Sequence, residues 1–198
     1  MSTSYLSVRA VVYTVLFSAI FSVFSFANIS LPFTPVPITM ATMAIMLAGA
    51  MLGALYGTIS ILLIIILSLL GLPLLAGANG LALLIDPSGG FVWIWPVCAL
   101  LIGLFLHNIK GTGWKTYLYT FIILEVFGSW IMYVTGVPWL AHSLHISLSK
   151  ALILGCYPYL PGDTIKAIIA TLIVVPMRNY FPLRRLLSTT TKNVVQRS

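Results

Sequence analysis

Charged residues are rare in this sequence, and acidic residues are the rarest of all. Of its 198 residues only three are Asp or Glu, against ten Lys or Arg, and charged residues make up 7 % of the chain. A soluble domain carries roughly 25 % charged residues. With 60 % hydrophobic residues and a mean hydropathy of +1.09, the composition excludes an ordinary soluble domain and predicts an integral membrane protein.

The chain also lacks the common motifs of enzymes and ATPases. It has no Walker A sequence and no HExxH sequence, and no paired-aspartate or serine–histidine arrangement stands out, so neither catalysis nor ATP hydrolysis is expected. Its two cysteines, Cys98 and Cys156, show no CxxC spacing, so we infer neither a disulfide nor a metal site. His142 and His145 have metal-ligand spacing but no evident third ligand, so no metal or cofactor is predicted.

Long apolar runs predict an all-α fold, with six transmembrane helices in one compact bundle over residues 1–198. A span needs roughly 20 apolar residues, within a range of about 17 to 25. The first run has no convincing cleavage site after it and is expected to be retained. Tyr56 and Gly57 form a very tight connection between the second and third spans. The predicted spans are 10–27, 38–55, 58–70, 91–106, 116–137 and 164–180.

The basic residues predict the orientation of the chain. Six spans place both termini on one side of the membrane, and most bases fall on that same side. By the positive-inside rule the termini and the basic tail, residues 181–198, are cytoplasmic. The bases on this side are Arg9, Lys110, Lys115, Arg178, Arg184, Arg185, Lys192 and Arg197, and the opposite side has Lys150 and Lys166.

Three unusual segments then lie together on the extracytoplasmic side. Prolines stiffen the segment 31–37, which suits an ordered cover. The segment 71–90 is too apolar for a solvated loop and too rich in glycine for a spanning helix, so we expect it to fold back onto the bundle. In one interpretation, backbone N–H groups left free by its glycines bind a ligand. In the other, Asn79 only links the turns of the segment by hydrogen bonds.

The third segment, 157–166, brings scarce polar groups to the start of an apolar helix. Pro161 and Gly162 indicate a turn, and Asp163 is predicted to be the N-cap of the last span. Asp163 and Lys166 are three apart and share a face. They are either an anchor for a ligand or an interfacial cap beside a snorkelling lysine. Because all three segments lie on the same side of the membrane and a pocket needs several walls, we favour a ligand pocket at the extracytoplasmic side.

Two other features of the sequence each allow two interpretations. Glu125 is the one acid expected deep in the membrane, where it is either a proton site or a carboxyl that holds helices together. A stripe of small residues on the first span either packs inside the protein or faces a separate subunit. Its members are Ala10, Thr14, Ser18 and Ser22.

Taken together, these segments resemble the BioY family, the biotin-specific substrate-binding subunits of energy-coupling-factor (ECF) transporters. The resemblance rests on residues 31–39, 71–73 with 76–77, 86–91 and 158–166, in that order. It implies a multi-pass subunit of a prokaryotic plasma membrane that binds biotin from outside. It also implies docking, through an alanine stripe on the first helix, onto a membrane scaffold protein that carries two ATPases. No nucleic-acid partner is implied.

The sequence departs from the family pattern at two places. Thr14, Ser18 and Ser22 stand where alanine is expected in the docking stripe, although they are still small. Ala41 stands where a glutamine is familiar after the proline segment, so no ligand contact is assigned there.

The chemistry of biotin suggests which residues would bind it. The ureido ring offers two N–H donors and one carbonyl acceptor, which suit Asp163, Lys166 and the amide of Asn79. The valerate carboxylate can meet backbone N–H groups near Gly89 and Gly90, or Lys166. The predicted walls are Phe33, Phe91, Trp93 and Tyr159, and the predicted lid consists of Pro32, Phe33, Thr34, Pro35 and Pro37.

The predicted function is therefore high-affinity capture of extracellular biotin, closure of the first loop, and release to the cytoplasm driven by a partner's ATP hydrolysis. One alternative is a stand-alone, ion-coupled carrier of a small organic solute that uses Glu125 as its coupling site. A weaker one is a membrane enzyme whose acid is Asp163.

Overall fold

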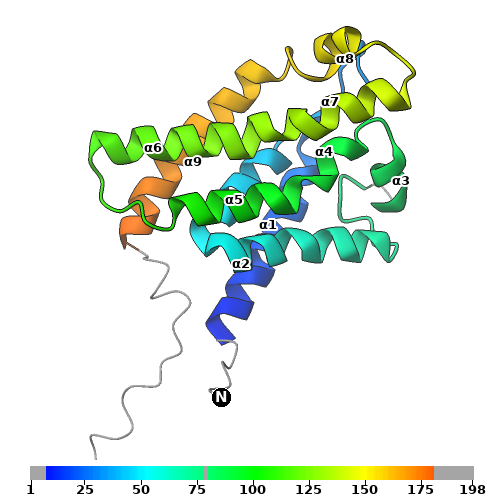
Figure 1. The fold of residues 1–198 in the computed structure, drawn as a ribbon. Helices are drawn as coiled ribbons and strands as arrows, with labels where there is room; N and C mark the ends of the chain where they lie inside the picture. The colour runs from blue at the N-terminus through cyan, green and yellow to red at the C-terminus, as the bar shows by residue number, and fades with distance from the viewer. Residues whose placement is uncertain (1–7, 78–79, 181–198) are drawn as a thin grey trace, which may run out of the picture.

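The computed structural model describes residues 8–77 and 80–180, and Figure 1 shows its fold. The regular elements of the described part are helices, apart from one short antiparallel ribbon in which Asn28 pairs with Thr39. The elements are α1 (Val8–Phe26), β1 (Asn28–Ile29), β2 (Ile38–Thr39), α2 (Ala41–Leu69), α3 (Gly80–Ile85), α4 (Gly89–Trp93), α5 (Trp95–Leu106), α6 (Trp114–Glu125), the π-helix η1 (Val126–Trp130), α7 (Ile131–Ser143), α8 (Leu148–Gly155) and α9 (Leu160–Tyr180).

Five helical stretches in the described residues are long and apolar enough to cross a membrane. A lipid-exposed backbone must satisfy its own hydrogen bonds, and a continuous helix does so within one segment. The stretches are Val8–Phe26, Ala41–Leu69, Gly89–Leu106, Trp114–Ser143 and Leu160–Tyr180. The second of them overlaps most of both spans predicted over 38–55 and 58–70.

A sharp break at Gly53 divides α2. This glycine has φ 76° and ψ −176°, a conformation that residues with a side chain rarely adopt. A Cβ placed on Gly57 would lie 2.8 Å from the carbonyl oxygen of Ala48, although nine residues of straight helix rise about 13.5 Å. The second half of α2 therefore turns back along the first. The predicted connection at Tyr56 and Gly57 was misplaced, since the reversal lies at Gly53.

The stretch 114–143 is longer than the predicted span 116–137. It runs without interruption through α6, the π-helix η1 and α7, and Pro138 lies inside α7. The connection after it is correspondingly short. It holds the short helix α8, whose N-cap Ser147 accepts a hydrogen bond from the N–H of Lys150.

The small-residue stripe of α1 packs inside the chain. Ser18 Oγ donates to the carbonyl oxygen of Ser60 in α2 at 2.8 Å, and Ser22 Oγ donates to that of Leu74 at 2.7 Å. Ala10 and Thr14 are buried as well. The stripe predicted for scaffold docking is thus covered by the chain itself, because small side chains let α2 approach closely. A partner that docks on α1 would meet its other face, which exposes valines such as Val12 and Val23.

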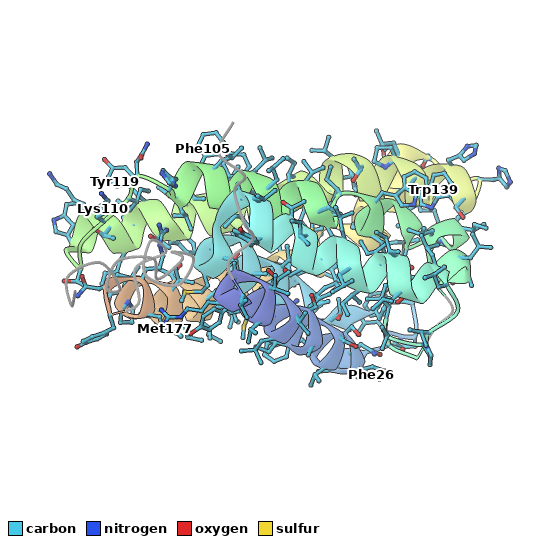
Figure 2. The ribbon with its side chains drawn as sticks, turned by 90° about the horizontal axis from the view of Figure 1, so that it is seen from below. Phe26, Phe105, Lys110, Tyr119, Trp139 and Met177 are labelled. Atoms are coloured by element: carbon cyan, nitrogen blue, oxygen red, sulfur yellow. The ribbon has the colours of Figure 1, made fainter. Side chains whose placement is uncertain are left out.

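The two ends of the bundle differ. Figure 2 places Lys110 and Met177 at one end and Trp139 at the other. The end of α5, the start of α6 and the end of α9 lie at the Lys110 end, and α3, α4 and α8 lie at the Trp139 end (Figure 1). The apolar core fills the space between, with fully buried side chains such as Phe21, Ile45 and Ile102.

Candidate functional site

An apolar pocket lies where α4, α7 and the start of α9 meet the ribbon β1–β2. Its wall is largely hydrocarbon and aromatic, with a few polar side chains. Such a composition is typical of small-molecule sites. The lining residues are Ser25, Asn28, Val36, Pro37, Thr39, Ala41, Thr42, Leu75, Ala76, Leu83, Ser88, Phe91, Val92, Trp95, Met132, Tyr133, Gly155, Tyr159, Asp163 and Lys166.

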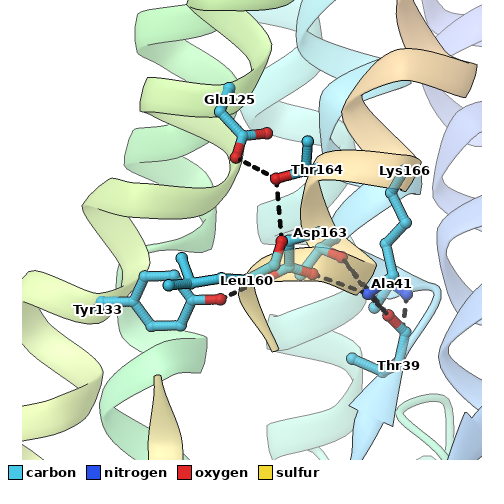
Figure 3. Close-up of polar contacts among 9 residues, drawn as sticks. Thr39, Ala41, Glu125, Tyr133, Leu160, Asp163, Thr164 and Lys166 are labelled. Atoms are coloured by element: carbon cyan, nitrogen blue, oxygen red, sulfur yellow. Dashed lines mark hydrogen bonds and ion pairs between the residues drawn. The ribbon is translucent and has the colours of Figure 1, made fainter. Parts of the chain in front are cut away.

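A buried ion pair forms the polar part of this wall. Lys166 Nζ lies 2.9 Å from Asp163 Oδ1, and the two residues are only 6 % and 7 % exposed (Figure 3). Lys166 Nζ also donates to the carbonyl oxygen of Thr39 at 2.7 Å and to Thr42 Oγ1 at 3.2 Å. Tyr133 donates its hydroxyl to Asp163 Oδ2 at 2.5 Å. The pair therefore ties α9 to β2, α2 and α7.

Asp163 is not the N-cap that its position after Pro161 and Gly162 predicted. The helix α9 already begins at Leu160, and the N–H of Asp163 donates to the carbonyl oxygen of Tyr159 at 2.9 Å. Its carboxylate thus lies in the first turn of α9, where the helix dipole favours negative charge. The predicted neighbours Asp163 and Lys166 do share a face, as their spacing required.

Trp95 lines the pocket and carries a buried donor without a partner among the described residues. The residue is 6 % exposed, and the donor is its Nε1. Leaving a buried donor unsatisfied costs about 1–3 kcal/mol.

The proline segment 30–37 is held against the pocket from outside. The ribbon β1–β2 closes its base, the Tyr159 hydroxyl donates to the carbonyl oxygen of Val36, and the same hydroxyl lies 3.3 Å from Thr34 Oγ1. Burial raises the pKa of this hydroxyl, so it remains a neutral donor. Val36 and Pro37 line the pocket, which makes the segment an ordered cover.

Comparison with known proteins supplies the context for this pocket. Residues 1–183 match the model of the BioY family. The chain belongs to the BioY family. Among its relatives, the biotin transporter BioY of Lactococcus lactis subsp. cremoris is 38 % identical over 173 residues, covering 86 % of this chain and 91 % of the relative. The biotin transporter BioY of Rhizobium etli is 35 % identical over 173 residues, covering 85 % and 92 %.

A solved structure agrees with the fold of this BioY-family chain. The crystal structure of the S-component for biotin from an ECF-type ABC transporter superimposes with a TM-score of 0.80 and is 37 % identical. The match covers 86 % of this chain and 91 % of the solved one. These relatives carry the names of transport proteins rather than of enzymes.

The pocket of the BioY-family chain contains some of the residues predicted for it. Asp163, Lys166, Phe91 and Tyr159 all line it. Asn79 lies outside the described residues. Other lining residues were not predicted as ligand contacts. They include Ser25, Thr39, Thr42, Trp95, Met132 and Tyr133.

Four predicted contacts do not line the pocket. Phe33 is exposed, and Trp93 is half exposed with its ring 4.3 Å from that of Trp139. A Cβ on Gly90 would lie 2.3 Å from the Trp139 side chain, and one on Gly89 would lie 2.1 Å from the carbonyl oxygen of Leu84. These glycines allow α4 to pack against α7 and α3, which is why they are glycine.

Glu125 links two helices beside the pocket. Its Oε1 accepts from Thr164 Oγ1 at 2.8 Å (Figure 3). The same oxygen accepts from Trp130 Nε1 at 3.1 Å, so Glu125 joins η1 to α9. The residue is 7 % exposed, and its Oε2 is buried without a partner in the described part of the chain. Thr164 is the neighbour of Asp163. This arrangement favours the helix-holding interpretation of Glu125.

Proposed function

We propose that this chain is the biotin-binding S-component of an ECF-type ABC importer in a prokaryotic plasma membrane. The observation that carries the proposal is the buried pair Asp163–Lys166 at the wall of an apolar pocket, in a chain whose relatives are named biotin transporters. Biotin combines a polar ureido ring with an apolar thioether ring and alkyl chain. The pocket offers matching surfaces to both parts.

The hydrogen-bond inventory of the pocket assigns roles to its polar groups. A lysine ammonium has three donors, and Lys166 Nζ already contacts three acceptors of the protein. Asp163 keeps spare lone pairs, because each carboxylate oxygen accepts about two bonds and receives one here. Asp163 therefore accepts from the ureido N–H groups. Lys166, predicted as a ligand donor, instead orients Asp163.

The proposed topology has six crossings with cytoplasmic termini. The two halves of α2 count as separate crossings because the chain reverses at Gly53. The positive-inside rule then places the Lys110 end in the cytoplasm and the pocket on the extracytoplasmic side. Biotin enters from outside, the segment 30–37 closes over it, and a scaffold protein with two ATPases drives its release inward.

Equilibrium binding tests this proposal directly. Biotin is titrated into the purified, detergent-solubilised chain by isothermal titration calorimetry, beside desthiobiotin, riboflavin and thiamine. Saturable biotin binding in the nanomolar range, without a signal from the two other vitamins, is expected. The absence of biotin binding by a demonstrably folded sample would overturn the assignment.

Loosening the cover should speed biotin release. Tyr159→Phe removes the hydroxyl that holds Thr34 and Val36, and one lost hydrogen bond of about 1 kcal/mol corresponds to about a fivefold faster dissociation rate. Tyr157→Phe is the matched control, since Tyr157 is exposed. Dissociation of radiolabelled biotin is followed after dilution into unlabelled ligand. Equal rates in the two variants would show that the segment is not a lid.

Substitution of Glu125 distinguishes the S-component from a second candidate function, an ion-coupled carrier. The unpartnered carboxylate oxygen of Glu125 is the observation that favours this second candidate. Glu125→Gln keeps an oxygen that can accept from Trp130 and Thr164, so biotin affinity should stay within about twofold. Glu125→Ala removes this link and should lower thermal stability. Uptake that requires an ion gradient, needs no ATPase and disappears in Glu125→Gln would favour the carrier instead.

A further inference from the structure

A second cleft, distinct from the biotin pocket, lies at the opposite end of the bundle. It is formed by the loop after α5, the first half of α6 and the last turns of α9. Figure 2 shows Lys110 at this end, far from Trp139 beside the other pocket. Polar and basic side chains line it, among them His107, Lys110, Thr116, Arg178 and Asn179.

Among residues 8–77 and 80–180, the cations of this cleft have no anionic partner. The chain has only three acidic side chains. Asp163 and Glu125 belong to the network beside the biotin pocket, and the carbonyl of Asp86 is bonded to Trp139 at the far end. The half-buried guanidinium of Arg178 donates to the carbonyl oxygen of Leu106 at 2.7 Å, its one hydrogen bond to a described residue. Its remaining N–H groups are available to an external anion.

The depth of the cleft matches that of lipid headgroups. Three candidate spans end or begin at it, at Leu106, Trp114 and Tyr180. Trp114 and Tyr180 are among the most exposed aromatic side chains of the chain, at 71 % and 75 %. Exposed Trp and Tyr at helix ends mark the membrane–water interface. The cleft therefore opens beside lipid phosphates rather than deep in water.

We propose that this cleft binds the phosphate of an anionic phospholipid headgroup, held by Arg178 and Lys110. A guanidinium presents its donors in a fork that fits phosphate oxygens, and lysine adds a point charge. Basic clefts between transmembrane helices on the cytoplasmic side commonly take such headgroups. A soluble phosphate ester has the same charged group, but it lacks the acyl chains that the neighbouring helix surfaces would cover. This inference does not depend on biotin binding.

Lipid titration tests the proposal. Dioleoylphosphatidylglycerol is titrated into the purified full chain in an uncharged detergent and binding is followed by native mass spectrometry, with dioleoylphosphatidylcholine as the zwitterionic comparison. Lys110→Gln should weaken phosphatidylglycerol binding about fivefold, and Arg178→Gln by at least as much. Lys115→Gln is the matched control, because Lys115 is exposed near this end but does not line the cleft.

The lipid titration can either support the proposed phosphate site or overturn it. Selective phosphatidylglycerol binding that Lys110→Gln weakens and Lys115→Gln leaves within twofold supports the site. Equal losses in the two lysine variants, or equal binding of phosphatidylcholine, would overturn it. Displacement of the lipid by millimolar sn-glycerol 3-phosphate would show that the source is soluble and would also overturn it. Lys110 is exposed, so its variant is expected to fold even if Arg178→Gln does not.

Discussion

Asp163→Asn should raise the biotin dissociation constant by more than tenfold, which corresponds to more than about 1.4 kcal/mol of binding free energy. The substitution preserves the shape of the side chain but removes its charge and turns one acceptor into a donor. That donor would face the Lys166 ammonium or the ureido N–H groups, which only donate, unless it turned toward the Tyr133 hydroxyl and left Lys166 without its charged partner. A misdirected buried polar contact costs more than a missing one.

Asp86→Asn is the matched control for this variant. Asp86 is exposed and does not line the pocket, so its neutralisation should leave biotin affinity within about twofold. Both variants are compared with the unaltered chain by isothermal titration calorimetry, with thermal unfolding as a check of folding. Unchanged affinity in a folded Asp163→Asn sample would remove Asp163 from the ligand site.

The sequence contained enough information to place the ion pair but not the opposite wall of the pocket. Asp163 and Lys166 are three apart on one helix, so their proximity follows from local geometry. Trp95, Met132 and Tyr133 reach the pocket only because α5 and α7 pack beside α9. That packing depends on contacts between segments far apart in the chain, which no local pattern encodes.

The positions of glycines predicted the ligand-contacting residues poorly. The glycines in 71–90 correctly predicted a segment that packs against the bundle, since a Cβ on Gly80 would lie 2.5 Å from the backbone of Ser68. A glycine indicates that something approaches the backbone closely, but not what approaches. At Gly89 and Gly90 the neighbours are Leu84 and Trp139 rather than the pocket.

The apolar runs predicted where long helices lie, and the differences from the structure fell where the backbone departs from a regular helix. Hydropathy responds to composition and not to dihedral angles, so the reversal at Gly53 and the π-helix η1 after Glu125 left no clear trace in it. The continuous stretch 114–143 was consequently predicted too short. Buried small residues on α1 were ambiguous for a similar reason, because a stripe that fits a partner helix also fits α2.

Lys166→Met should destabilise the folded chain by about 3–5 kcal/mol, the usual effect of removing one member of a buried ion pair. Asp163 would keep its charge in a buried position with only the Tyr133 hydroxyl as a partner. The carbonyl oxygen of Thr39 and the hydroxyl of Thr42 would lose their donor as well. Thermal unfolding in detergent should shift down by about 10 °C. Lys150→Met, at an exposed lysine, should leave it unchanged.

The double variant Asp163→Asn/Lys166→Met separates stability from ligand binding. Removing both charges eliminates the uncompensated carboxylate, so most of the lost stability should return, as it does when buried pairs are replaced together. Biotin binding should not return, because the acceptor for the ureido ring is still absent. If the double variant regained stability and bound biotin with near-normal affinity, the pair would be a purely structural link between α9, α2 and α7. If it stayed as unstable as Lys166→Met, the unpaired charge would not be the cause of the loss, and the hydrogen bonds of Lys166 to Thr39 and Thr42 would account for it instead.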